Sequence, residues 1–250
     1  MNLEMVLGFL VVVLTATGMI YHLIKKSHAG SRPFLRKSAD IERLRAAIEL
    51  SVEDGSRVHV TLGSADLTDA ANPSALAGLD SLHRIGQSSS TSDLPPVCSS
   101  GNGAFALLSK DTLAAVASDT NTWDIYDPDQ GYLTGVTPMA YAVGAMDVMS
   151  EPGVKSNILI GNFGSESGFM TITSEEQGAF TVAASDSIIG LSVFMATIRN
   201  VVVGEGLFAI PARLALAPAQ LAGLKMQDML RVIIVAALVI GALFKALGLL

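Results

Sequence analysis

Apolar residues form one long run at each end of the chain and alternate with polar residues in between. Residues 5–24 contain no charged side chain, and residues 232–250 contain only Lys245. Because a helix rises about 1.5 Å per residue, ~20 residues cross the ~30 Å hydrocarbon core of a bilayer. The two runs therefore predict a transmembrane helix at each end.

Two other interpretations of these runs stay open. The first run could be a secretory signal peptide, although an acid and no base precede it and no small-residue cleavage site closes it. Either run could instead be a buried helix of a soluble domain, although neither has a polar face. Thirteen apolar residues separate Arg231 from Lys245, so the lysine amine can reach the far interface, and we expect it to act as an anchor.

Basic residues flank both runs on the side that faces the middle of the chain. We call these residues the basic collar: Lys25, Lys26, Arg32, Arg36, Lys37 and Arg231. Positive charge beside a span marks its cytoplasmic side. We therefore expect a protein of the cytoplasmic membrane with two spans, both termini outside, a cytoplasmic middle, and a collar that contacts anionic lipid.

Between the runs, the spacing of apolar residues changes repeatedly from helical to strand-like. Helical spacing predicts helices over residues 40–53, 72–85 and 103–117, a further helix that ends at residue 149, and helical segments in much of the rest to residue 216. Alternation or short apolar runs predict strands over residues 57–62, 97–99, 123–126, 156–161 and 180–184. This order predicts an α/β fold, with a mainly parallel, Rossmann-like sheet and helices on both faces.

The expected organisation has five parts. They are a transmembrane helix over 5–24, a basic juxtamembrane arm over 25–37, a cytoplasmic α/β domain over 38–216, a linker or amphipathic segment over 217–231, and a transmembrane helix over 232–250. Half of the residues are hydrophobic, and the mean hydropathy is +0.48. Residues 38–231 carry ten basic and 22 acidic side chains, a net charge of −12, which argues against nucleic acid as a partner.

Several short motifs occur in an order that resembles a bacterial membrane-protein family catalogued only as a domain of unknown function. The motifs are Gly-Ser-Arg-Val at 55–58, Gly-Asn-Phe-Gly-Ser-Glu-Ser at 161–167, Gly-Glu-Gly-Leu-Phe-Ala at 204–209 and Lys-Met-Gln-Asp at 225–228. The resemblance covers most of the chain. It implies no activity, because the family has none assigned to it.

Two glycine-rich turns follow predicted strands and are the candidate binding residues. They comprise Gly101, Asn102 and Gly103 in one turn, and Gly161, Gly164 and Ser165 in the other. Ligands of parallel sheets bind beyond the carboxyl ends of the strands, where backbone amides can hold an anion. Tight-turn geometry is the better-supported reason for the glycines, since no P-loop and no Gly-x-Gly-x-x-Gly fingerprint is present.

Catalytic chemistry has weaker support. The four histidines are scattered, and no metal-ligand spacing or Gly-x-Ser-x-Gly motif occurs, so we expect no catalytic residue, no metal and no cofactor. A triad assembled only in space stays open. Cys98 is either a thiol of lowered pKa or a small buried hydrophobe. It is the one cysteine of the sequence, so an internal disulfide is excluded. Glu166 and Glu205 fit capping or pairing roles better than acid–base catalysis.

These observations lead to three hypotheses of function. Apolar residues are dense over 140–149 and 201–216, which favours association, and we expect a membrane-anchored scaffold that self-assembles into a homo-oligomeric ring or larger closed array. The alternative is a membrane-tethered sensor or binding domain for a nucleotide or small anionic metabolite. An enzyme comes third, and it would be supported if Glu205, Cys98 or His59 converged in one pocket.

Overall fold

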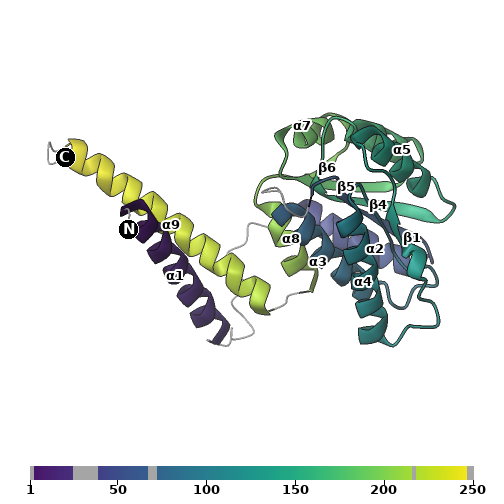
Figure 1. The fold of residues 1–250 in the computed structure, drawn as a ribbon, viewed down its shortest axis with the longest axis horizontal. Coiled ribbons are helices and arrows are strands. Elements are labelled where there is room, and N and C mark those ends of the chain that lie inside the picture. The colour runs from purple at the N-terminus through teal and green to yellow at the C-terminus, as the bar shows by residue number, and fades with distance from the viewer. Residues whose placement is uncertain (1–2, 25–38, 67–71, 216–217, 247–250) are drawn as a thin grey trace. The chain divides into compact units, whose positions relative to one another are not determined.

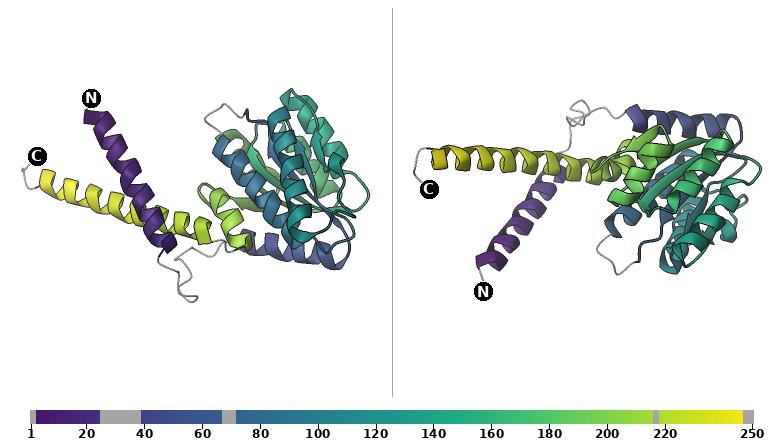
Figure 2. Two further views of the ribbon diagram at one scale, coloured as in Figure 1. Left: turned by 60° about the horizontal axis from the view of Figure 1, so that its bottom comes forward. Right: turned by 90° about the horizontal axis from the view of Figure 1, so that it is seen from above.

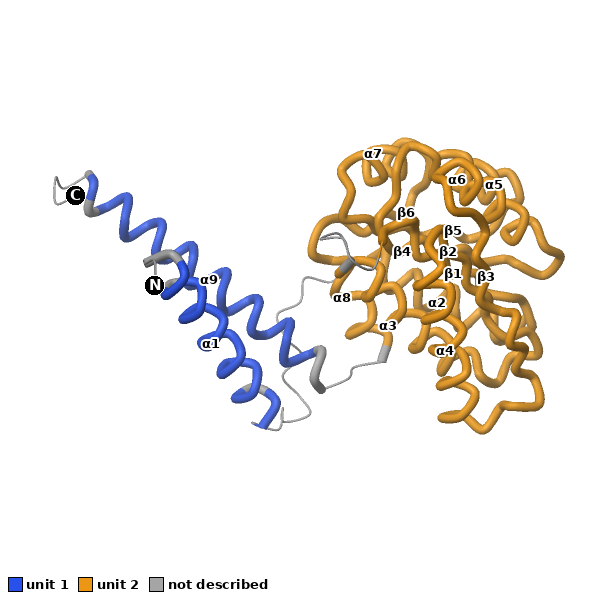
Figure 3. The backbone as a smooth tube through the Cα atoms, viewed as in Figure 1, with its two compact units in different colours: residues 1–37, 216–250 blue, residues 38–215 orange. Residues whose placement is uncertain are grey.

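The computed structural model describes residues 3–24, 39–66, 72–215 and 218–246 (Figure 1). The chain divides into two compact units: Met1–Lys37 with Leu216–Leu250, which we call the terminal unit, and Ser38–Ala215, which we call the central domain (Figure 3). The predicted lipid contacts Lys25, Lys26, Arg32, Arg36 and Lys37 lie outside the described residues.

Six parallel strands form the sheet of the central domain, in the order β3-β2-β1-β4-β5-β6. Their bounds are β1 Arg57–Gly63, β2 Val97–Ser100, β3 Gly131–Leu133, β4 Val154–Asn162, β5 Phe180–Ser185 and β6 Asn200–Val202. This is the strand order of a doubly wound Rossmann sheet. The strands β1 to β3 are added outward on one side of the centre, and the chain then returns to the centre and adds β4 to β6 outward on the other side. The predicted α/β class with a parallel, Rossmann-like sheet is confirmed.

Helices cover both faces of this sheet (Figure 2). One face carries α2 Ala39–Glu53, α3 Asn72–Ser88, α4 Gly103–Thr120 and α8 Gly206–Ala215, and the other carries α5 Pro138–Met149, α6 Ser167–Glu176 and α7 Ile188–Thr197. Strand alternation explains the two layers, because Val58, Val60 and Ile158 pack into one hydrophobic cluster while Leu159 and Ala183 pack into the other.

The structure corrects one predicted strand and adds another. Residues 123–126 form turns instead of a strand, and the exposed Trp123 ring meets the Tyr126 ring edge to face, with centroids 5.3 Å apart. The third strand lies further along the chain, after a short 3-10 helix at Pro128–Gln130, where the Asp127 side chain accepts a hydrogen bond from the Asp129 amide. The added strand is β6, which follows α7 and precedes α8 in the sequence and forms the edge of the sheet beside β5.

Glycines bring the ends of β1 and β4 together at the point where the strand order reverses. Gly63 has φ +78°, and a Cβ there would lie 2.2 Å from the Asn162 carbonyl oxygen. A Cβ on Gly161 would lie 2.0 Å from the Leu62 carbonyl oxygen. Both contacts are with backbone, so a side chain at either position would force the two central strands apart.

The terminal unit consists of two helices, α1 Leu3–Ile24 and α9 Pro218–Ala246. Among the described residues, one helical segment, Leu221–Leu243, is long and apolar enough to cross a membrane, and Gly8–Tyr21 is a shorter apolar stretch. Helix α9 runs without a break from Pro218, so the expected linker and the expected second span belong to a single helix.

The two helices of the terminal unit run antiparallel and contact each other near the end of α1 (Figure 1). The Met226 side chain fills the notch at Gly18, where a Cβ would lie 2.3 Å from the methionine sulfur. Beyond this contact the helices diverge (Figure 2). The side chains of residues 231–240 are all exposed.

Candidate functional site

The candidate binding residues meet at one edge of the sheet. Gly101–Gly103 follow β2, Gly161 and Asn162 end β4, and β1 lies between those two strands. The topology thus places both predicted turns beside the end of β1, at the crevice where doubly wound folds bind ligands. Sequence reasoning identified the turns but not their proximity, which the strand order creates.

The turn after β2 is closed by its own hydrogen bonds. The Gly101 amide donates to the Gly63 carbonyl oxygen over 2.9 Å, and the Ala104 amide donates to the Asn102 side-chain oxygen over 2.8 Å. A Cβ on Gly101 would lie 2.8 Å from the Ser64 Cβ, whereas one on Gly103 would meet nothing within 4 Å. Gly101 therefore serves close packing, and Asn102 serves as the N-cap of α4.

The turn after β4 already holds a carboxylate. The Gly164 amide donates to Oε1 of Glu166 over 2.9 Å, and Glu166 is only 9% exposed. A Cβ on Gly164 would lie 2.3 Å from the other oxygen of that carboxylate. The position where a bound anion would meet the Gly164 amide is thus occupied by the chain itself, while Ser165 is exposed beside it.

A second carboxylate reinforces the negative charge at this edge. The Asn162 side-chain amide donates to Oδ1 of Asp186 over 2.9 Å. The neighbouring turn after β5 is also closed internally, because the Ser187 amide donates to the Ser185 hydroxyl over 3.1 Å. With Glu166, Asp186 gives this edge an electrostatic character that favours cations over anions.

A buried tyrosine ties α5 to the end of β1. The Tyr141 hydroxyl contacts the Thr61 hydroxyl and accepts a hydrogen bond of 3.1 Å from the Gly63 amide. Burial raises the pKa of Tyr141 above its ordinary value, so the phenol stays neutral at physiological pH. Tyr141 thus holds α5 against the end of β1, and no sequence motif predicts this role.

A chain of polar side chains crosses the sheet beneath α6. The Ser99 hydroxyl lies 2.8 Å from Nε2 of His59, whose Nδ1 lies 3.1 Å from the Asn157 side-chain oxygen. The Asn157 amide donates to Ser174 over 2.6 Å, and Ser174 lies 2.7 Å from the Thr181 hydroxyl. We call these five residues the polar chain.

Burial fixes the protonation state of His59. The ring is completely buried, and this burial lowers the pKa of His59 from 6.5 to about 4. Because the Asn157 amide donates to Ser174, its oxygen faces His59 and accepts the Nδ1 proton. Nε2 then accepts from Ser99. Every polar atom of the neutral ring is therefore paired, which makes His59 a structural group.

The three residues whose convergence would have supported an enzyme do not meet. His59 faces the α6 side of the sheet, whereas Cys98 belongs to the hydrophobic cluster beneath α3 and α4. Glu205 is exposed and follows β6, at the end of the sheet. Burial raises the pKa of the Cys98 thiol to about 12, as expected of a small buried hydrophobe. Among the described residues, no three His, Cys, Asp or Glu side chains could hold a metal ion.

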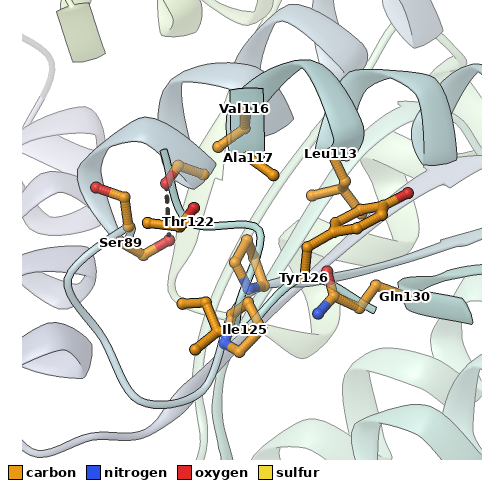
Figure 4. Close-up of a pocket in the computed structure, with 12 residues that line it drawn as sticks. Ser89, Leu113, Val116, Ala117, Thr122, Ile125, Tyr126 and Gln130 are labelled. Atoms are coloured by element: carbon orange, nitrogen blue, oxygen red, sulfur yellow. Dashed lines mark hydrogen bonds between the residues drawn. The ribbon is translucent and has the colours of Figure 1, made fainter. Parts of the chain in front are cut away.

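A small pocket lies at the opposite ends of the strands (Figure 4). Its wall includes Pro96, which precedes β2, and Ala117 near the end of α4, together with Tyr126 and Gln130. Its cavity volume of about 20 Å³ is room for one or two water molecules. The pocket contains none of the sequence-predicted binding residues.

Comparison with known proteins identifies a family and no function. The model of the family described as "Domain of unknown function (DUF6754)" matches residues 2–249. The match covers almost the whole chain, so the chain belongs to this family, and the predicted membership of an uncharacterised family is confirmed. Neither the comparison with curated proteins nor that with solved structures yields a match.

Proposed function

We propose that this member of the DUF6754 family is a membrane-anchored scaffold whose central domain self-assembles on the cytoplasmic face of the membrane. In this proposal α1 and α9 both span the membrane, both termini lie outside, and the basic collar binds anionic lipid. The assembly is a homo-oligomeric ring or larger closed array. The observation that carries the proposal is that both units leave large apolar side chains uncovered.

The membrane anchor is supported by the composition of α9. Residues 232–244 include nine Leu, Ile, Val or Phe residues. At ~0.3–0.6 kcal/mol each, their insertion is favourable by roughly 3–5 kcal/mol. Lys245 follows the apolar segment and is exposed, which suits an interfacial anchor.

The contact between α1 and α9 supports a chain that crosses the membrane twice. Membrane helices pack closely where a small residue leaves a notch for a neighbouring side chain. Met226 fills the notch at Gly18, and the Met19 methyl lies 3.8 Å from where a Cβ on Gly223 would be. An antiparallel pair of this kind would place the C-terminal end of α1 and the N-terminal end of α9 on the same side of the membrane.

A binding domain for a nucleotide or small anionic metabolite is the second candidate, and the strand order favours it. Glu166 and Asp186 weigh against an anion at this edge. A thermal-shift screen of nucleotides against the full chain tests the candidate. A stabilising ligand whose effect is abolished by Ser165→Trp, and preserved by Leu50→Trp on α2, would favour binding over scaffolding.

Two measurements test the scaffold. The full chain should stay with the membrane pellet after alkaline carbonate extraction, because α9 is inserted. Electron microscopy of the detergent-purified protein should then show particles of one closed symmetry. Release into the carbonate supernatant would contradict the anchor, and particles of single-chain size would contradict the assembly.

A further inference from the structure

Helices α5, α6 and α7 expose large apolar side chains on the outer side of their layer. Two residues from each helix define what we call the apolar face: Met139, Val143, Phe169, Ile172, Ile188 and Met195. Each of the six is at least 50% exposed. Within each helix the two are spaced by three, four or seven residues, so they lie on one side of it.

The three helices form a continuous layer. Helix α6 contacts both α5 and α7 and lies between them (Figure 3). A Cβ on Gly168 of α6 would lie 3.2 Å from Cγ1 of Val193 on α7, so these helices pack closely. Their inner sides are filled by buried residues such as Met170 and Phe194. The exposed residues therefore cover the outer surface of one packed layer.

Charge decides what kind of partner suits this face. The three helices contain no Lys or Arg, and their charged residues are Asp147, Glu175 and Glu176. Anionic lipid headgroups and nucleic acid need positive charge to bind. Both are disfavoured, which favours an apolar protein surface as the partner.

On α2, α3 and α4, the exposed apolar residues Leu50, Leu76 and Leu107 share their helices with charged side chains. On the other side of the sheet, α2 carries the ion pair Arg45–Glu49, α3 carries Asp80 and Arg84, and α4 carries Lys110, paired with Asp129. A contact between unlike surfaces would bury some of these charges. A contact of like surfaces buries none of them, and it produces a two-fold axis.

The size of the face suits such a contact. Full burial of a Val, Ile, Met or Phe side chain is worth ~1.5–3 kcal/mol at ~25 cal/mol per Å², which corresponds to roughly 60–120 Å². The six residues, each at least half exposed, therefore offer on the order of 300 Å² of apolar surface. A standard interface buries ~800 Å² per partner, so the face supplies the apolar centre of such a contact and the surrounding polar rim supplies the rest.

We propose that two copies of the chain pair through their apolar faces about a two-fold axis. The pairing rests on the proposed self-assembly and identifies its first contact. A ring or larger array requires a second contact elsewhere on the chain. The pairing buries Phe169 and Ile172, on the middle helix, near the centre of the contact.

Charge substitution in the full-length protein tests the pairing. Phe169→Glu and Ile188→Glu place a carboxylate within the face, while Leu50→Glu places one at a 59% exposed leucine on α2. In native mass measurements in detergent, the wild type and Leu50→Glu should give even multiples of one chain. The two face variants should weaken the dimer at least ~30-fold, the loss expected at an interface hot spot. Circular dichroism checks that each variant is folded.

Cysteine cross-linking gives a second readout if the charged variants fail to fold. Cys98 is buried, so an introduced cysteine is the only accessible thiol among the described residues. Under oxidation, Phe169→Cys or Met195→Cys should form a disulfide-linked dimer, and Leu50→Cys should not.

Each outcome separates the pairing from the scaffold. A wild-type oligomer whose mass is unchanged by both face charges would overturn the pairing and leave the scaffold standing. A wild-type monomer would overturn both. Cross-linking by neither face cysteine, or equally by Leu50→Cys, would overturn the pairing.

Discussion

Acidification should destabilise the central domain through His59. The folded protein holds the ring neutral, with a pKa of about 4, while the unfolded chain returns it to 6.5. Between these two values the unfolded state binds a proton that the folded state does not. Stability therefore falls as the pH falls through this window, and it is unaffected by this group above about pH 7.

The magnitude follows from the difference between the two pKa values. Each pKa unit corresponds to about 1.4 kcal/mol, so the 2.5 units between 6.5 and about 4 correspond to roughly 3 kcal/mol. About 2 kcal/mol of this is lost by pH 5. The loss is large against the typical ~5–15 kcal/mol stability of a domain.

Unfolding of the full chain in detergent, followed by circular dichroism between pH 7.5 and 4.5, measures this effect. Carboxylates also titrate in this range, so the informative quantity is the difference between the wild type and His59→Gln. The variant should be less stable than the wild type at pH 7.5, because the polar chain is disturbed. The difference in unfolding free energy between the two should become smaller at lower pH, because only the wild type loses stability through His59. A constant difference across the pH range would refute the assignment of a neutral, buried His59. If the variant does not fold, an NMR titration of the wild-type ring should give a pKa near 4.

Three further predictions concern the same domain. Gly161→Ala should destabilise it by ~2–4 kcal/mol in a denaturation assay, because the new Cβ would lie 2.0 Å from a backbone oxygen. Gly103→Ala is the control and should be neutral in the same assay, because its Cβ would meet nothing within 4 Å. An equal effect of the two substitutions would contradict the close approach of β1 and β4. Tyr141→Phe should cost ~1–3 kcal/mol, because the buried Gly63 amide loses its acceptor, and an unchanged unfolding midpoint would contradict this. Cys98 should resist a maleimide at pH 7.5 until the protein is denatured, and rapid labelling of the folded protein in a mass assay would show the thiol to be accessible.

The sequence predicts those elements whose burial leaves a periodic pattern. Val58, Val60 and Leu62 alternate with polar residues and form β1, and the consecutive apolar residues of β4 are buried on both faces, as expected. The order of strands and helices then leads to the correct fold class. The strand predicted at 123–126 was wrong because Trp123 and Tyr126 favour strands by type, whereas here the two rings pack on each other in a turn.

The candidate site was predicted in position but not in chemistry. Glycines after strands mark the turns, yet only the fold shows that Gly164 donates to Glu166 and that Gly101 donates to Gly63. The polar chain was missed because His59 and Asn157 are 98 positions apart. Polar residues at alternate positions of otherwise apolar strands are the signal that would have identified it.

Native mass measurement of the full chain, purified from membranes in detergent, tests the central claim most directly. We expect a single species at an even multiple of the 26.0 kDa chain mass. A monodisperse monomer would contradict it.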